Sequence, residues 1–77
     1  MLYIHKNNKL YIKVGESLDE KNPNNVLVQY RALYEDSFPF LTKWSRSKKE
    51  FEDKNRFRKA RFLEVLLYIL GGKEVKF

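Results

Sequence analysis

The stretch from residue 43 to residue 61 holds the side chains with the strongest chemical signal. Nine lysines and arginines stand there against three carboxylates, and this local excess of six equals the formal net charge of the whole chain. Trp44, Phe51 and Phe57 lie among the cations, and Phe62 follows them. Cations neutralise phosphates and aromatic rings stack on bases, so the pattern is typical of proteins that bind nucleotides or single strands. It predicts an anion-binding surface made of Lys43, Trp44, Arg46, Lys48, Lys49, Arg56 and Arg58.

The four aromatic residues of this stretch have different expected positions. In a small domain, aromatic side chains more often fill the core than form a binding platform. We therefore expect Phe51, Phe57 and Phe62 in the core and Trp44 on the surface. The simpler interpretation of the cations is a solvated face that keeps the domain soluble. The anion-binding interpretation requires the nine cations to gather on one exposed face.

Residues suited to catalysis or to metal binding are scarce. His5 is the only histidine, and it has no neighbour in a recognised nucleophile arrangement. The chain has no cysteine, which excludes disulfides, thiolate zinc sites and cysteine nucleophiles. Adjacent acids such as Glu35 and Asp36 fit no calcium loop, and the three glycines form no phosphate-binding loop. We therefore expect no enzymatic activity, no metal and no cofactor.

Length and composition bound the class of protein. The 77 residues, of which 43% are hydrophobic, suit one small folded domain over residues 1–77 rather than a disordered chain. The longest apolar run, residues 65–70, is far shorter than the roughly 20 residues that cross a bilayer. With no cysteine and no signal-peptide pattern, we expect a cytoplasmic protein without a membrane partner.

Apolar alternation near the N-terminus predicts a β-hairpin. Residues 2–5 and 10–14 flank an Asn-Asn pair, and asparagine tolerates the positive φ that tight turns need. Gly15 is expected to end the second strand. The polar segment 16–25, which contains a proline between asparagines, is then the longest loop.

Two further strands and a short helix are expected next. Residues 26–34 are β-branched and aromatic, as in a central strand. Residues 38–44 resume an extended path, with Pro39 restricting its start to a sheet edge. Ser47 begins a capping-box spacing, so a short helix should run to about residue 53.

The segment from residue 58 to residue 70 is apolar at nearly every position of its second half. Its composition favours a helix capped by the Gly-Gly pair at residues 71–72, while a hairpin formed by residues 66–70 and 73–77 is the alternative. A helix that is apolar nearly all round must be enclosed, and so small a domain has little core to enclose it. This predicts a homodimer through Phe62, Val65, Leu66 and Ile69.

Several of these pieces together resemble a known family. They are residues 6–15, the strand 28–34, Trp44-Ser45-Arg46, Glu50-Phe51-Glu52-Asp53 and Arg56-Phe57. In this order they resemble the bacterial and phage family "domain of unknown function 1653" over about residues 5–57. Ser47 stands where the family usually has proline, and the apolar tail has no counterpart. The resemblance implies a strongly curved antiparallel sheet akin to an SH3-like barrel and a phage or bacterial origin, but no function.

The sequence thus predicts an α+β fold: a small, strongly curved antiparallel sheet of SH3-like type with a short helix and an apolar C-terminal helix. The leading functional hypothesis is a non-enzymatic basic module that binds an anionic partner, either nucleic acid or an acidic host protein, and so inhibits host machinery. One alternative is a sponge that sequesters nucleotides, with Arg46 on the phosphates and Trp44 or Tyr34 stacked on the base. The other is an oligomeric structural protein.

Overall fold

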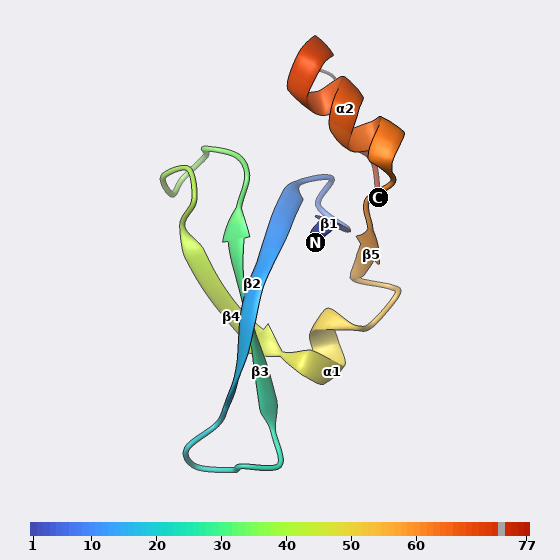
Figure 1. Cartoon of the computed structure of the whole chain (residues 1–77). Helices are drawn as coiled ribbons and strands as arrows, with labels where there is room; N and C mark the ends of the chain where they lie inside the picture. Colours follow the sequence, from blue (N-terminus) through green and yellow to red (C-terminus); the bar gives the residue numbers. More distant parts are fainter. Residues whose placement is uncertain (73) are drawn as a thin grey trace.

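The computed structural model describes residues 1–72 and 74–77, which form an α+β fold around one antiparallel sheet (Figure 1). Its elements are β1 (Leu2–His5), β2 (Leu10–Leu18), β3 (Val26–Ala32), β4 (Lys43–Ser47), α1 (Lys48–Phe51), β5 (Phe57–Lys59) and α2 (Phe62–Gly71). The strand order is β4-β3-β2-β1-β5, so β4 and β5 are the two edges of an open sheet. The α+β class and the antiparallel sheet are confirmed, whereas the SH3-like barrel is not.

The N-terminal hairpin is confirmed, but its second strand is longer than expected. β1 and β2 pair in a register that sets Tyr3 opposite Tyr11, and Asn8 has the positive φ of 64° that the turn requires. β2 does not end at Gly15. The pairing with β3 shifts between Lys13 and Gly15, and a strand can continue past a glycine through such a bulge. The following loop is therefore confined to residues 19–25.

The connection from β3 to β4 corrects two expectations. β3 ends at Ala32 and lies beside β2, which takes the central position in the sheet. The strand expected over residues 38–44 begins only at Lys43. Before it, the Thr42 amide and hydroxyl both donate to the Pro39 carbonyl, and Leu41 has a φ of 69°, in the left-handed region. This turn prevents an extended path from the proline onward, although β4 is an edge strand as expected.

Both expected helices form, but α1 ends at Phe51 instead of at about residue 53, and α2 begins at Phe62 instead of at residue 58. The Ser47 hydroxyl accepts from the Glu50 amide at 3.3 Å and so begins α1. α2 ends at Gly72, whose φ of 62° is that of a left-handed cap, so the C-terminal helix is confirmed over the hairpin alternative. The short strand β5, which pairs with β1, was not predicted.

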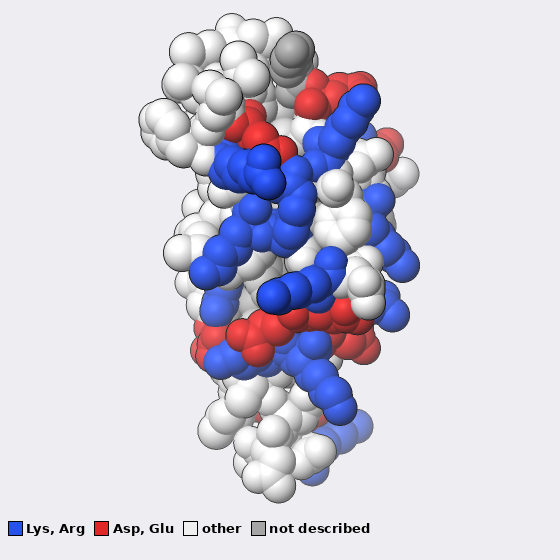
Figure 2. Space-filling view, turned by 90° about the vertical axis from the view of Figure 1, so that its right-hand side faces the viewer, with Lys and Arg blue, Asp and Glu red and all other residues white. Residues whose placement is uncertain are grey.

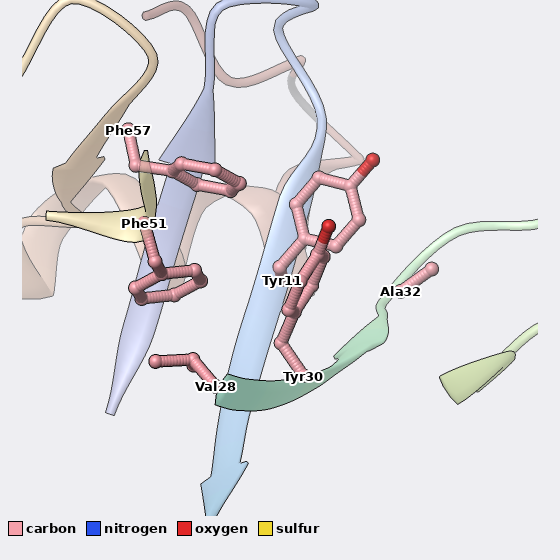
Figure 3. Packing of buried hydrophobic residues seen from close by; sticks show 6 residues of the cluster. All are labelled: Tyr11, Val28, Tyr30, Ala32, Phe51 and Phe57. Carbon is pink, nitrogen blue, oxygen red and sulfur yellow. The ribbon is translucent and has the colours of Figure 1, made fainter. Parts of the chain in front are cut away.

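The sheet carries a hydrophobic cluster on each face, because successive side chains of a strand point to opposite sides. Tyr11 belongs to the first cluster and its neighbour Leu10 to the second. The buried members of the first cluster are Tyr11, Val28, Tyr30, Ala32, Phe51 and Phe57 (Figure 3). Those of the second are Ile4, Leu10 and Val75, with the half-buried Tyr68 of α2 packed against them.

The positions expected for the phenylalanines are partly wrong. Phe51 and Phe57 are buried as predicted, but Phe62 is 81% exposed. Phe62 is the first residue of α2, a helix in which no residue is buried, so the enclosure expected for this helix is not found within the described chain. Among the described residues, no helix is long and apolar enough to cross a membrane.

Candidate binding site

Strand alternation divides the cations expected to form one surface. In β4, Trp44 pairs with Tyr30 and Arg46 pairs with Val28, so both side chains lie on the first face. Lys43, one residue before Trp44, projects from the opposite face of the strand. The sheet therefore separates Lys43 from Trp44 and Arg46.

Several of the remaining predicted cations are paired with carboxylates. The Lys48 ammonium lies 3.4 Å from Glu16, the Arg56 guanidinium lies 3.7 Å from Asp53, and Arg58 lies 2.6 Å from Glu64. Lys49 is exposed on α1. In Figure 2, on the side that bears β5 and α1, the lysines and arginines form a broad band that is crossed by a row of acidic side chains. Carboxylates therefore interrupt the surface that the sequence predicted to bind anions.

A pocket on the first face brings other residues together. Its volume is about 330 Å³, and it is bounded by β1 to β4 and by the segment that connects β3 to β4. The residues that line it are His5, Asn7, Tyr11, Tyr30, Ala32, Tyr34, Asp36, Ser37, Phe38, Trp44 and Arg46. Trp44 and Arg46 from the predicted surface therefore meet Tyr34 here, the three residues that the nucleotide hypothesis combined.

The walls of the pocket are aromatic rings that fix one another at right angles. Tyr11 is edge-on to Tyr30 and to Tyr34, with ring centroids 5.3 and 5.4 Å apart. Phe38, another lining residue, is edge-on to Trp44 with ring centroids 4.9 Å apart. Edge-to-face packing is a favoured arrangement of aromatic pairs. The half-buried Trp44 is consequently held in place and still lines the pocket.

A chain of hydroxyl groups runs along one wall. The Tyr11 and Tyr34 hydroxyl oxygens are 2.5 Å apart, and the Asn7 side-chain amide donates to Tyr11 at 3.2 Å. Burial raises the pKa of Tyr34, and the hydrogen bond with Tyr11 raises it further. Tyr34 therefore remains neutral and offers a hydrogen bond instead of negative charge.

Arg46 is the cation of the pocket, and its orientation is fixed from three sides. Its Nε donates to the Tyr30 hydroxyl at 3.3 Å, and one terminal nitrogen donates to Glu50 at 3.1 Å. Its guanidinium carbon lies 5.6 Å from the centre of the Phe57 ring. The hydrogen bond with Tyr30 is the main cause of a raised pKa for Arg46. A guanidinium has five N–H donors, and these contacts use two of them.

His5 borders the pocket as a neutral ring. Its Nδ1 accepts from the Asn7 amide at 3.1 Å, which leaves the ring proton on Nε2. Burial is the main cause of a lowered pKa for His5; the side chain of Asn7 raises this pKa, and the nearby charges of Arg46 and Lys6 lower it further. Among the described residues, no group of three His, Cys, Asp or Glu side chains is placed to hold a metal. The aromatic walls and the Arg46 guanidinium are groups of the kinds that pack on planar rings and bind anions.

Sequence reasoning missed several lining residues, of which Tyr11 and Tyr30 matter most. The sequence does contain a signal for these two tyrosines, because aromatic residues on the same face of neighbouring strands become cross-strand neighbours. Aligning Tyr11, Tyr30 and Trp44 across β2, β3 and β4 requires the register, which depends on the bulge and on the late start of β4. Asp36 and Phe38 come from an irregular segment for which no periodicity exists.

The comparisons with known proteins give no information about the site. No family model, no curated protein and no solved structure matches this chain. The resemblance to the family "domain of unknown function 1653" therefore stays a prediction.

The ion pair of Arg58 predicts a pH-dependent stability. Arg58 donates to both Glu64 oxygens, at 2.8 and 2.6 Å, and these bonds lower the pKa of Glu64 to about 2. A carboxyl whose pKa is lowered on folding stabilises the fold above its unfolded pKa and loses that effect as the pH falls through about 5 to 2. Because the pair is partly exposed, we expect a contribution of about 1–2 kcal/mol.

The measurement is urea unfolding of the wild type and of Glu64→Gln at neutral pH and at about pH 3. The wild type should be the more stable protein at neutral pH, and the difference should shrink by about 1 kcal/mol at pH 3, because Glu64 with a pKa of about 2 is then still largely ionised in the folded state. Other carboxyls titrate equally in both proteins and cancel in the comparison. An unchanged difference would show that the pair does not stabilise the fold.

Proposed function

We propose that this protein is a non-enzymatic binding module that holds a nucleotide in the aromatic pocket of the first face. The observation that carries this proposal is the convergence of Trp44, Tyr34 and Arg46 on one cavity of about 330 Å³. Pockets for small ligands start at about 300 Å³ and combine apolar walls with a few polar groups. The nucleotide is therefore preferred to a partner that needs a continuous cationic surface.

Each chemical part of a nucleotide has a counterpart among the lining residues. The base packs against the aromatic walls, since every base offers a π-face. The phosphate accepts hydrogen bonds from the Arg46 guanidinium, whose planar fork suits phosphate oxygens. Asp36 and Ser37 at the β3–β4 connection offer acceptors and a hydroxyl for base or ribose groups. Recognition thus needs an aromatic ring and an anion in the same molecule.

A single-stranded nucleic acid is the second candidate. It is favoured by the cationic band on the side of β5 and α1 (Figure 2). Lys54, which precedes β5, and Lys59, which ends it, are both exposed. One base would enter the pocket while neighbouring phosphates meet these lysines. The acidic host protein, the inhibition of host machinery, the cytoplasmic location and the SH3-like relationship remain predictions.

The fluorescence of Trp44, the only tryptophan, gives a direct test. We expect ribonucleoside monophosphates to change its emission with saturation, because a base against the indole alters its surroundings. Free tryptophan amide at equal absorbance corrects for light absorbed by the nucleotide. Mass spectrometry of the filtrate from heat-denatured protein should also reveal any nucleotide that remains bound through purification.

The outcomes separate the two candidates. Saturable binding of a monophosphate supports the nucleotide proposal. Binding of a short oligonucleotide alone, with an affinity that falls steeply as salt is raised, favours the single strand. If neither changes the emission of Trp44 nor is retained by the protein, the proposal is wrong.

A further inference from the structure

The exposed side of α2 is an apolar surface that has no part in the pocket of the first face. Figure 1 shows α2 at one end of the molecule, beyond the ends of the strands, and the same end is largely uncharged in Figure 2. The half-buried residues of α2, Glu64, Val65 and Tyr68, share the side that faces the protein. Tyr68 fixes the helix there by donating to the Leu33 carbonyl at 2.5 Å.

The opposite side of α2 presents six apolar side chains to solvent. Their exposed fractions are Phe62 81%, Leu63 63%, Leu66 36%, Leu67 42%, Ile69 69% and Leu70 76%. At about 150–200 Å² for a whole side chain of this size, these fractions leave on the order of 600 Å² exposed. That is the upper end of what a monomeric protein exposes in one patch. The patch therefore indicates a binding surface.

We propose that this surface binds the same surface of a second copy, with the two α2 helices antiparallel. Two such patches offer at most about 1,200 Å² in total, which is the lower limit of stable protein interfaces. The exposed side of α2 carries no charge, since the only charged residue of the helix, Glu64, is bound to Arg58 on the inner side. An anionic membrane surface instead attracts helices with lysine or arginine along the polar face. Charge therefore favours a second copy.

Helix geometry determines which residues meet in such a dimer. With 100° between successive residues, Leu66 lies at the centre of the exposed side, with Phe62 and Ile69 on one flank and Leu63 and Leu70 on the other. We place a two-fold axis between the two helices, perpendicular to both, at the level of Leu66. The helices then run in opposite directions, and each flank faces the same flank of the second copy. Leu66 then meets its own copy, Phe62 meets Ile69 of the second copy, and Leu63 meets Leu70 of the second copy. Val65, which the sequence placed in the interface, lies outside it.

A charge-swap experiment tests both the dimer and its geometry. Analytical ultracentrifugation of the wild type should show a dimer at micromolar concentrations, as expected for an interface of this size. Leu63→Glu and Leu70→Lys should each weaken the dimer at least about tenfold, because each places a charge against apolar side chains. A mixture of the two variants should form a heterodimer, because one glutamate then faces one lysine and the second contact between Leu63 and Leu70 is kept.

The control variant is Leu18→Glu, which places the same charge on another exposed leucine at the end of β2. It should leave the dimer unchanged, and circular dichroism should show equal helix content in all variants. A wild type that stays monomeric at about 100 μM, some tenfold or more above the expected dissociation constant, overturns the proposal. So does a mixture that stays monomeric, or a monomer that binds anionic phospholipid vesicles through Leu63 and Leu70. Each result is independent of nucleotide binding.

Discussion

Phe57→Ala is expected to remove a large part of the folding stability of the protein. Phe57 is 3% exposed and stacks on Phe51 with ring centroids 4.5 Å apart, and it is edge-on to Tyr30, Tyr11 and His5. Removing a buried phenylalanine typically costs about 3–5 kcal/mol. A domain of this length has about 4–12 kcal/mol in all. Thermal unfolding followed by circular dichroism should show a midpoint lower by at least about 15 °C.

Phe62→Ala is the matched control, because it removes the same side chain five residues further along. Phe62 is 81% exposed at the start of α2, so its removal should change the midpoint by a few degrees at most. Dilute protein should be used, so that self-association through α2 does not add to the stability. Equal losses in the two variants would contradict the assignment of Phe57 to the core.

The two phenylalanines also show how far sequence reasoning reaches. Both follow arginines in one basic stretch, and composition alone placed both in the core. What separates them is β5, a strand of three residues that carries Phe57 onto the first face by pairing with β1. A strand this short has no periodicity to detect, and its pairing partner lies more than fifty residues earlier in the chain. The burial of Phe57 thus depends on the long-range pairing of β5 with β1, which the local sequence pattern does not reveal.

The elements with a local physical cause were predictable. The hairpin turn follows from the tolerance of asparagine for positive φ, α1 from the hydroxyl of Ser47, and the end of α2 from Gly72. The candidate site depended on features of another kind. Its rings on β2, β3 and β4 meet only in the register that the bulge near Gly15 and the late start of β4 set, and further lining residues come from the irregular segment 33–42. Trp44 and Arg46 were found because both belong to the basic stretch from residue 43 to residue 61, and β4 places them on one face because they are two residues apart.

Arg46→Ala is expected to abolish the preference of the pocket for a phosphate. In the wild type, AMP should bind about 10- to 100-fold more tightly than adenosine, since a charge-assisted hydrogen bond contributes about 1.5–3 kcal/mol. Without the guanidinium, the two ligands should bind with nearly equal affinity. Arg46→Lys should retain part of the preference, because it keeps the charge but loses the planar fork. Titration of Trp44 fluorescence with each ligand measures these ratios.

The ratio of AMP to adenosine binding separates a local contact from an effect of net charge. Lys21→Ala also removes one positive charge, but from the exposed loop between β2 and β3, and should leave the ratio within about twofold of the wild type. A general loss of packing around Phe57 would weaken both ligands alike and would not change the ratio. If Arg46→Ala and Lys21→Ala change it equally, the phosphate is held by the overall field of a basic protein. Arg46 would then serve chiefly to hold Tyr30 and Glu50 in place.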